Sequence, residues 1–233
     1  MRILPQEPSA AGFMIVSFLY MLILTPLPLY LIPVAMTLLL IHLSTFDETF
    51  RRLKISPKEA APYLALNIIP YLVLPLFVKV NLVVLVIPAI IIFLYLYLFK
   101  SRDNPHAYIL GSSIPTLTSF IIIYLSPKVT LTQLVFWYAL AIYVSATAAY
   151  IESKLPWRKV DPRTALAVWG LSLPVFIFKP CSLIAFIEPT IKFVRNVLNN
   201  VKVNPKELKR FGWKEMSRFM LYSTLLLILF KVF

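Results

Sequence analysis

Long apolar runs alternate with short polar or proline-containing breaks along the whole chain. Most runs approach the length of about 20 residues that a helix needs to cross the hydrocarbon core of a bilayer. The pattern predicts an all-α, polytopic membrane helix bundle that forms a single transmembrane domain, residues 1–233. We expect about nine transmembrane helices, at approximately 12–25, 28–45, 61–78, 81–99, 106–125, 130–151, 164–178, 181–199 and 213–232.

The distribution of positive charge predicts how these helices are oriented. With the N-terminus in the cytoplasm, nearly all of the 23 lysines and arginines fall on cytoplasmic connections; the exceptions are Lys79, Lys128, Lys179 and Lys231. Lysine and arginine are retained on the cytoplasmic side of membrane proteins. We therefore expect a multi-pass plasma-membrane protein with a cytoplasmic N-terminus and an external C-terminus.

Composition agrees with this class. Hydrophobic residues make up 60% of the chain and charged residues only 14%, whereas soluble domains carry about 25% charged residues. The net charge of +13 is explained by retention of the loops on the cytoplasmic side, so we predict no nucleic-acid partner.

The segment 181–199 is the least apolar of the predicted helices, because it contains Glu188, Pro189, Lys192 and Arg195. Hydropathy alone would place it at the membrane surface. If it did not cross, however, the strongly basic segment 192–218 would lie outside the cell, against the charge rule. We therefore expect residues 181–199 to cross the membrane.

The same segment holds the first candidate site. Glu188, Lys192 and Arg195 follow the spacing of one helix face, and Asn199 extends that face. Ionisable side chains in membrane helices usually face the bundle interior or a wet cavity. One interpretation is a binding site for an anion or a lipid head group near the cytoplasmic surface. The alternative is an internal Glu188–Lys192 pair, with long basic side chains that reach the interface.

Two sets of acidic residues follow the second and sixth predicted helices. The first set is Asp47 and Glu48, interleaved with Arg51 and Arg52; the second is Glu152 and Asp161. Clustered carboxylates can hold Mg²⁺ together with a diphosphate, and these residues are also candidates for lipid or anion binding. The competing interpretation is a pair of solvated loops with local ion pairs, because cations lie among the acids.

His42 and His106 lie on different predicted helices near the cytoplasmic surface. Two such histidines could ligate a haem, and ordinary hydrogen bonding at the interface is the alternative. The single Cys181 excludes an internal disulfide and any site made of several cysteines. We predict no metal centre and no resident cofactor.

Short motifs at both ends of the chain resemble those of a known family. Leu4-Pro5-Gln6-Glu7 is similar to the opening Pro-x-Glu-His-Gly of the YwiC-like membrane proteins, with Pro8 in place of the histidine. Asn204-Pro205-Lys206 and Gly212-Trp213-Lys214-Glu215 resemble that family's ending. The helix count and the charged loops resemble the wider UbiA superfamily of prenyltransferases. The resemblance implies a UbiA-like fold, while the degenerate aspartate motifs imply that the prenyltransferase chemistry is absent.

These observations lead to three expectations of function. The first is a structural or accessory subunit, without its own redox or catalytic centre, of a larger respiratory-type membrane complex; its partners would be membrane lipids and other membrane subunits. The second is a divergent UbiA-like isoprenoid- or lipid-binding protein or prenyltransferase. The third is a small transporter, which the lack of paired glycine-broken helices disfavours.

Overall fold

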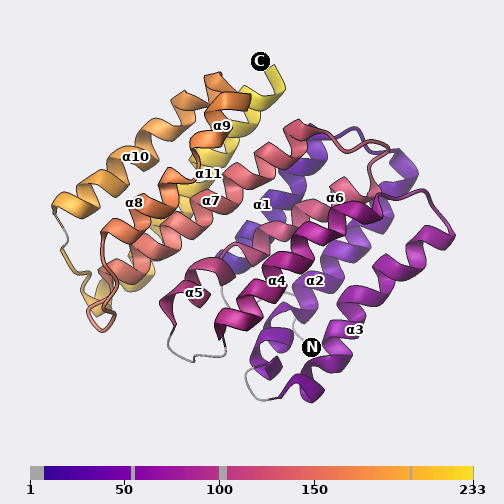
Figure 1. The fold of residues 1–233 in the computed structure, drawn as a ribbon, viewed down its shortest axis with the longest axis horizontal. Helices are drawn as coiled ribbons and strands as arrows, with labels where there is room; N and C mark the ends of the chain where they lie inside the picture. Colours follow the sequence, from indigo (N-terminus) through magenta and orange to yellow (C-terminus); the bar gives the residue numbers. More distant parts are fainter. Residues whose placement is uncertain (1–7, 54–55, 100–103, 200, 233) are drawn as a thin grey trace. The chain divides into compact units, whose positions relative to one another are not determined.

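The computed structural model describes residues 8–53, 56–99, 104–199 and 201–232 (Figure 1), which are helical with short connections and contain no strand. Several helical stretches are long and apolar enough to cross a membrane: Leu29–Leu53, Lys58–Leu76, Leu82–Phe99, Pro105–Leu125 and Leu131–Lys154. Two shorter apolar helices, Ser9–Leu24 and Arg163–Phe178, accompany them. The prediction of an all-helical protein is confirmed for the described residues, and the length and apolar composition of these helices suit a membrane protein.

Within the described ranges, consecutive helices join into the nine helical stretches that the sequence predicts. The α-helices are α1 (Pro8–Leu24), α2 (Ile32–Leu53), α3 (Pro57–Val73), α4 (Val86–Phe99), α5 (Pro105–Gly111), α6 (Ser119–Leu125), α7 (Leu131–Lys154), α8 (Arg163–Gly170), α9 (Leu173–Phe178), α10 (Leu183–Leu198) and α11 (Leu208–Val232). Short 3₁₀ helices extend or join them: η1 (Leu29–Leu31), η2 (Leu74–Leu76), η3 (Leu82–Leu85), η4 (Ile114–Thr118), η5 (Pro180–Ser182) and η6 (Pro205–Glu207).

The second predicted helix is longer than the apolar pattern indicates. We expected a charged loop from residue 46, but α2 continues to Leu53. Glu48 pairs with Arg51 and Arg52 at helical spacings of three and four residues, and such pairs stabilise an exposed helix end. The polar residues therefore extend the helix instead of ending it.

Two other predicted helices differ at particular residues. The stretch 106–125 is divided, because α5 ends at Gly111 and η4 follows before α6. Pro115 lies in η4, and proline supplies no backbone N–H for a continuous α-helix. The last helix begins earlier than residue 213, because Asn204 caps η6 by accepting a hydrogen bond from the Lys206 N–H.

The described chain divides into two compact units, and the prediction of a single transmembrane domain remains a prediction. Unit 1 comprises residues up to 88 together with 117–129. Within it, α1 packs against α6, and α2 packs against α3. Hydroxyl groups of α6 and of the residue before it cross to α1, because Thr118 donates to the Met14 carbonyl and Ser119 to the Ser17 carbonyl. The outer face of α3 is apolar and exposed, as a lipid-facing surface would be.

Unit 2 comprises residues 89–116 and 130–233. Its central helix α7 packs against α5, α8 and α11, and α10 packs against α8 and α11; Figure 1 shows α7, α8, α10 and α11 running side by side. An aromatic cluster fills the interior: the Tyr143 ring stacks on Tyr222 with centroids 4.3 Å apart, and Trp169 stacks on Phe186. This packing aligns the polar residues of α7, α10 and α11 along one groove.

Candidate functional site: a basic groove beside helix α10

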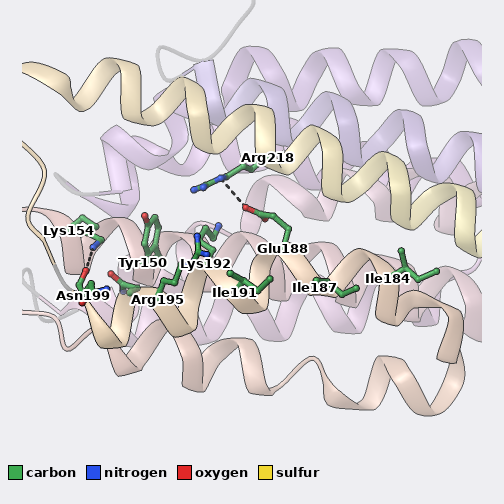
Figure 2. Close-up of a pocket in the computed structure, with 11 residues that line it drawn as sticks. Tyr150, Lys154, Ile184, Ile187, Glu188, Ile191, Lys192, Arg195, Asn199 and Arg218 are labelled. Atoms are coloured by element: carbon green, nitrogen blue, oxygen red, sulfur yellow. Dashed lines mark hydrogen bonds and ion pairs between the residues drawn. The ribbon is translucent and has the colours of Figure 1, made fainter.

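A groove of about 630 Å³ lies within unit 2, between α7, α10 and α11. We call it the basic groove. Its lining residues are Tyr150, Lys154, Ile184, Ile187, Glu188, Ile191, Lys192, Arg195, Asn196, Asn199 and Arg218. Figure 2 shows the isoleucines following one another along α10 toward the basic residues. The groove therefore has an apolar end and a basic end.

An ion-pair network with a buried Lys192–Glu215 pair lies at the basic end. The Lys192 Nζ donates to a carboxylate oxygen of Glu215 at 3.0 Å, and both side chains are only 3% exposed. Glu215 also accepts from Arg218 at 2.6 Å, and Arg218 in turn contacts Glu188 at 3.1 Å. The four groups carry two positive and two negative charges, so the network is neutral overall.

Contacts other than the Glu215 ion pair also stabilise the buried ammonium group of Lys192. Its Nζ also donates to the Thr147 hydroxyl at 3.2 Å. The same nitrogen lies 4.5 Å, 4.9 Å and 5.3 Å from the ring centroids of Phe193, Tyr143 and Tyr150. Aromatic faces attract cations, most strongly where water is excluded. The network fixes α10 against α7 and α11, and it leaves Lys192 little freedom to bind anything else.

Two further cations of the groove are not neutralised in this way. Arg195 is exposed on α10, and within the described ranges neither it nor Lys154 forms an ion pair with a carboxylate. The Lys154 Nζ donates to the Asn199 carbonyl at 3.4 Å and lies over the Tyr150 ring. Among the described residues, the basic end therefore holds two cations without a carboxylate partner, the exposed Arg195 and the buried Lys154.

Backbone and side-chain contacts hold the end of α7 to the segment that follows α10. The Val203 N–H donates to the Lys154 carbonyl at 3.0 Å, and the Lys202 Nζ donates to the Ser153 carbonyl at 2.7 Å. Asn196 of α10 donates to the Ser153 hydroxyl at 3.0 Å. These contacts bring together two connections that the charge pattern assigns to the same, cytoplasmic side.

The structure confirms that Glu188, Lys192 and Arg195 share one face of a helix, because all three line the basic groove. The alternative of an internal Glu188–Lys192 pair is wrong, since each residue pairs with α11 instead. Sequence reasoning did not identify Glu215 or Arg218 as their partners. The sequence did contain a signal for these partners: Glu215 is an acid in a mainly basic segment, and Arg218 follows it at the helical spacing of three residues.

Of the acids after the second and sixth predicted helices, Glu48 and Glu152 form local ion pairs with arginines. Glu48 accepts hydrogen bonds from Arg51 and Arg52, its neighbours on α2. Glu152 lies 3.1 Å from Arg158, and Asp161 accepts from the Arg163 N–H at the start of α8. Asp47 lies on α2 with the first set. In the described ranges no group of three or more histidine, cysteine or acidic side chains is arranged to hold a metal.

The two histidines have different surroundings. Both ring nitrogens of His42 are engaged by α3: Nδ1 by the Asn67 amide oxygen, and Nε2 by the Tyr71 hydroxyl at 2.7 Å. This arrangement leaves His42 no free nitrogen for haem iron and favours the hydrogen-bonding interpretation. His106 is exposed at the start of α5.

No family model, curated protein or solved structure matches this chain. Kinship with the YwiC-like proteins and the UbiA superfamily therefore stays a prediction. Of the motifs behind it, Leu4–Glu7 lies outside the described residues. Asn204–Lys206 forms the cap before α11, and Glu215 is the buried partner of Lys192.

Proposed function

We propose that this protein is a multi-pass membrane protein that binds an anionic lipid in the basic groove. The observation that carries the proposal is the adjacency of a cationic end and an apolar row in one groove. A lipid has the complementary arrangement, with a charged head group and a hydrocarbon tail. This function belongs to the lipid-binding alternative of the sequence analysis and requires no prenyltransferase chemistry.

The apolar row suits a hydrocarbon chain. Ile184, Ile187 and Ile191 are 58%, 58% and 46% exposed, and their spacing places them on one face of α10. Seven residues of α-helix extend about 10 Å, a substantial part of one leaflet's hydrocarbon layer. An acyl chain along this row would cover apolar side chains, while its head group would reach Arg195 and Lys154.

The proposed membrane orientation places the head-group end at the cytoplasmic surface of the plasma membrane. It takes all nine helical stretches as crossings, with the N-terminus inside. Contacts within each unit support it, because connections assigned to the same side meet. In unit 1, Asn81 hydrogen-bonds to the Tyr124 and Ser126 carbonyls, and in unit 2 the Lys179 Nζ lies over the Phe230 ring. All of these residues are assigned to the external side.

Lipid binding is tested with protein purified in detergent and depleted of lipid. Native mass spectrometry should show tighter retention of anionic phosphatidylglycerol than of zwitterionic phosphatidylcholine with the same acyl chains. The double variant Lys154→Gln/Arg195→Gln should lose at least about tenfold in affinity for the anionic lipid, because each charge-assisted contact contributes on the order of 1.5–3 kcal/mol.

A matched control uses Lys209→Gln/Arg210→Gln, which removes two exposed cations of α11 that do not line the groove. This variant should bind like the unaltered protein. Equal losses in both double variants would show that overall charge governs binding, and the proposed site would then be wrong.

A further inference from the structure

We infer that the lipid head group in the basic groove carries a hydroxyl donor beside its phosphate, as a glycerol phosphodiester does. This inference rests on the proposed function and specifies its ligand. The phosphate would be bound by Arg195 and Lys154. The hydroxyl would donate to Asn196, which lines the same groove.

The side-chain amide of Asn196 is the reason to expect a hydrogen-bond donor on the ligand. Its side chain is buried, with the residue 2% exposed, and its amide oxygen has no hydrogen-bond partner within the described ranges. Buried amide oxygens are nearly always hydrogen-bonded. Because Asn196 lines the groove, a ligand hydroxyl that reaches this buried oxygen would satisfy it.

The orientation of this amide follows from its neighbours. The Ser153 hydroxyl donates its proton to the Tyr150 carbonyl at 2.7 Å, so toward Asn196 it can only accept. The Asn196 Nδ2 must then be the atom that donates to Ser153, at 3.0 Å. Because a hydroxyl has a single proton, exchanging the amide oxygen and nitrogen would place two acceptors in contact. The oxygen is therefore the atom left without a partner.

A comparison of phospholipid head groups narrows the class of ligand that fits the groove. A fully ionised phosphomonoester offers only acceptors, so it would satisfy the cations and leave the Asn196 oxygen without a partner. Choline has no polar hydrogen. Ethanolamine has donors, but its positive charge would meet the excess positive charge of Lys154 and Arg195. A glycerol phosphodiester combines an anionic phosphate with neutral hydroxyl donors.

The test compares four lipids with identical acyl chains on the lipid-depleted protein: phosphatidylglycerol, phosphatidate, phosphatidylethanolamine and phosphatidylcholine. Phosphatidylglycerol should bind tightest, about tenfold tighter than phosphatidate. In the variant Asn196→Ala this preference over phosphatidate should disappear, while both anionic lipids should still bind more tightly than phosphatidylcholine. If Asn196→Ala does not fold, the order of the four lipids on the unaltered protein decides.

The outcomes separate the two proposals. Equal binding of phosphatidylglycerol and phosphatidate overturns the hydroxyl inference and leaves the lipid-binding proposal standing. Equal binding of all four lipids overturns both. Soluble glycerol 1-phosphate is the last arm: if it binds as tightly as phosphatidylglycerol, the ligand is a free phosphate ester and the lipid assignment is wrong.

Discussion

Replacing Glu215 with glutamine probes the buried network that positions the basic groove. The substitution preserves the shape of the side chain and removes one negative charge. Glu215 is 4% exposed and contacts Lys192 at 3.0 Å and Arg218 at 2.6 Å. In the variant, Lys192 would stay buried without an anionic partner.

The expected cost follows from the geometry. Two unit charges 3.0 Å apart attract by about 5.5 kcal/mol at an effective dielectric constant of roughly 20. The desolvation of both ions offsets much of this attraction, so the intact pair contributes little net stability. Removing one partner, however, leaves the other desolvated and uncompensated, which typically costs about 3–5 kcal/mol. We expect the free energy of unfolding to fall by that amount.

The assay is reversible unfolding in mixed micelles of dodecyl maltoside and sodium dodecyl sulfate. The double variant Lys192→Met/Glu215→Gln should recover more than half of the lost free energy, because the uncompensated charge is gone and an unbranched apolar chain fills the same space. Glu207→Gln serves as the control, since Glu207 is exposed on η6, and its effect should stay within about 0.5 kcal/mol.

Two results would refute this reasoning. If Glu215→Gln destabilises no more than Glu207→Gln, Lys192 is solvated and the network is not buried as described. If adding Lys192→Met increases the loss instead of reducing it, Lys192 stabilises the fold by contacts independent of Glu215.

The remaining predictions concern other parts of the molecule. Gly111→Ala should destabilise by about 1–3 kcal/mol, because its Cβ would lie 2.7 Å from the Tyr95 ring; Gly170→Ala, where nothing lies within 4 Å, should be neutral or stabilising in the same unfolding assay. Asn67→Leu should cost about 1–3 kcal/mol by leaving His42 without its Nδ1 partner, and an unchanged unfolding curve would contradict the importance of that contact. The prediction of a larger complex is checked by mild extraction and size measurement: co-migrating membrane proteins support it, and a chain that is always alone removes it.

The apolar pattern was sufficient to predict the helical stretches, because most apolar runs approach the length of one bilayer crossing and end at polar or proline-containing breaks. It was less informative at their polar ends. Hydropathy predicted that Glu48 and Arg52 lie in a loop. In the structure they lie on α2, and their ion pair stabilises the polar end of that helix. The interruption before α6 does not appear in the apolar pattern. Its one local sign is Pro115 in η4, which lacks the backbone N–H that a continuous α-helix needs.

The candidate site was predicted in part. Helical spacing placed Glu188, Lys192 and Arg195 on one face, since that relation depends only on residues within one helix. The pairing with Glu215 and Arg218 depends on how α10 packs against α11, which no local pattern specifies. The spacing suggested a bond between Glu188 and Lys192, but tertiary packing gave each of them a partner on α11.

The orientation of the basic end can be measured directly with cysteine labelling in intact cells. In a Cys181→Ser background, Lys206→Cys should react with a membrane-permeant maleimide and resist an impermeant one, whereas Lys128→Cys should react with both. Labelling of Lys206→Cys by the impermeant reagent would place the segment after α10 outside the cell. It would contradict the nine-crossing topology and the cytoplasmic lipid site together.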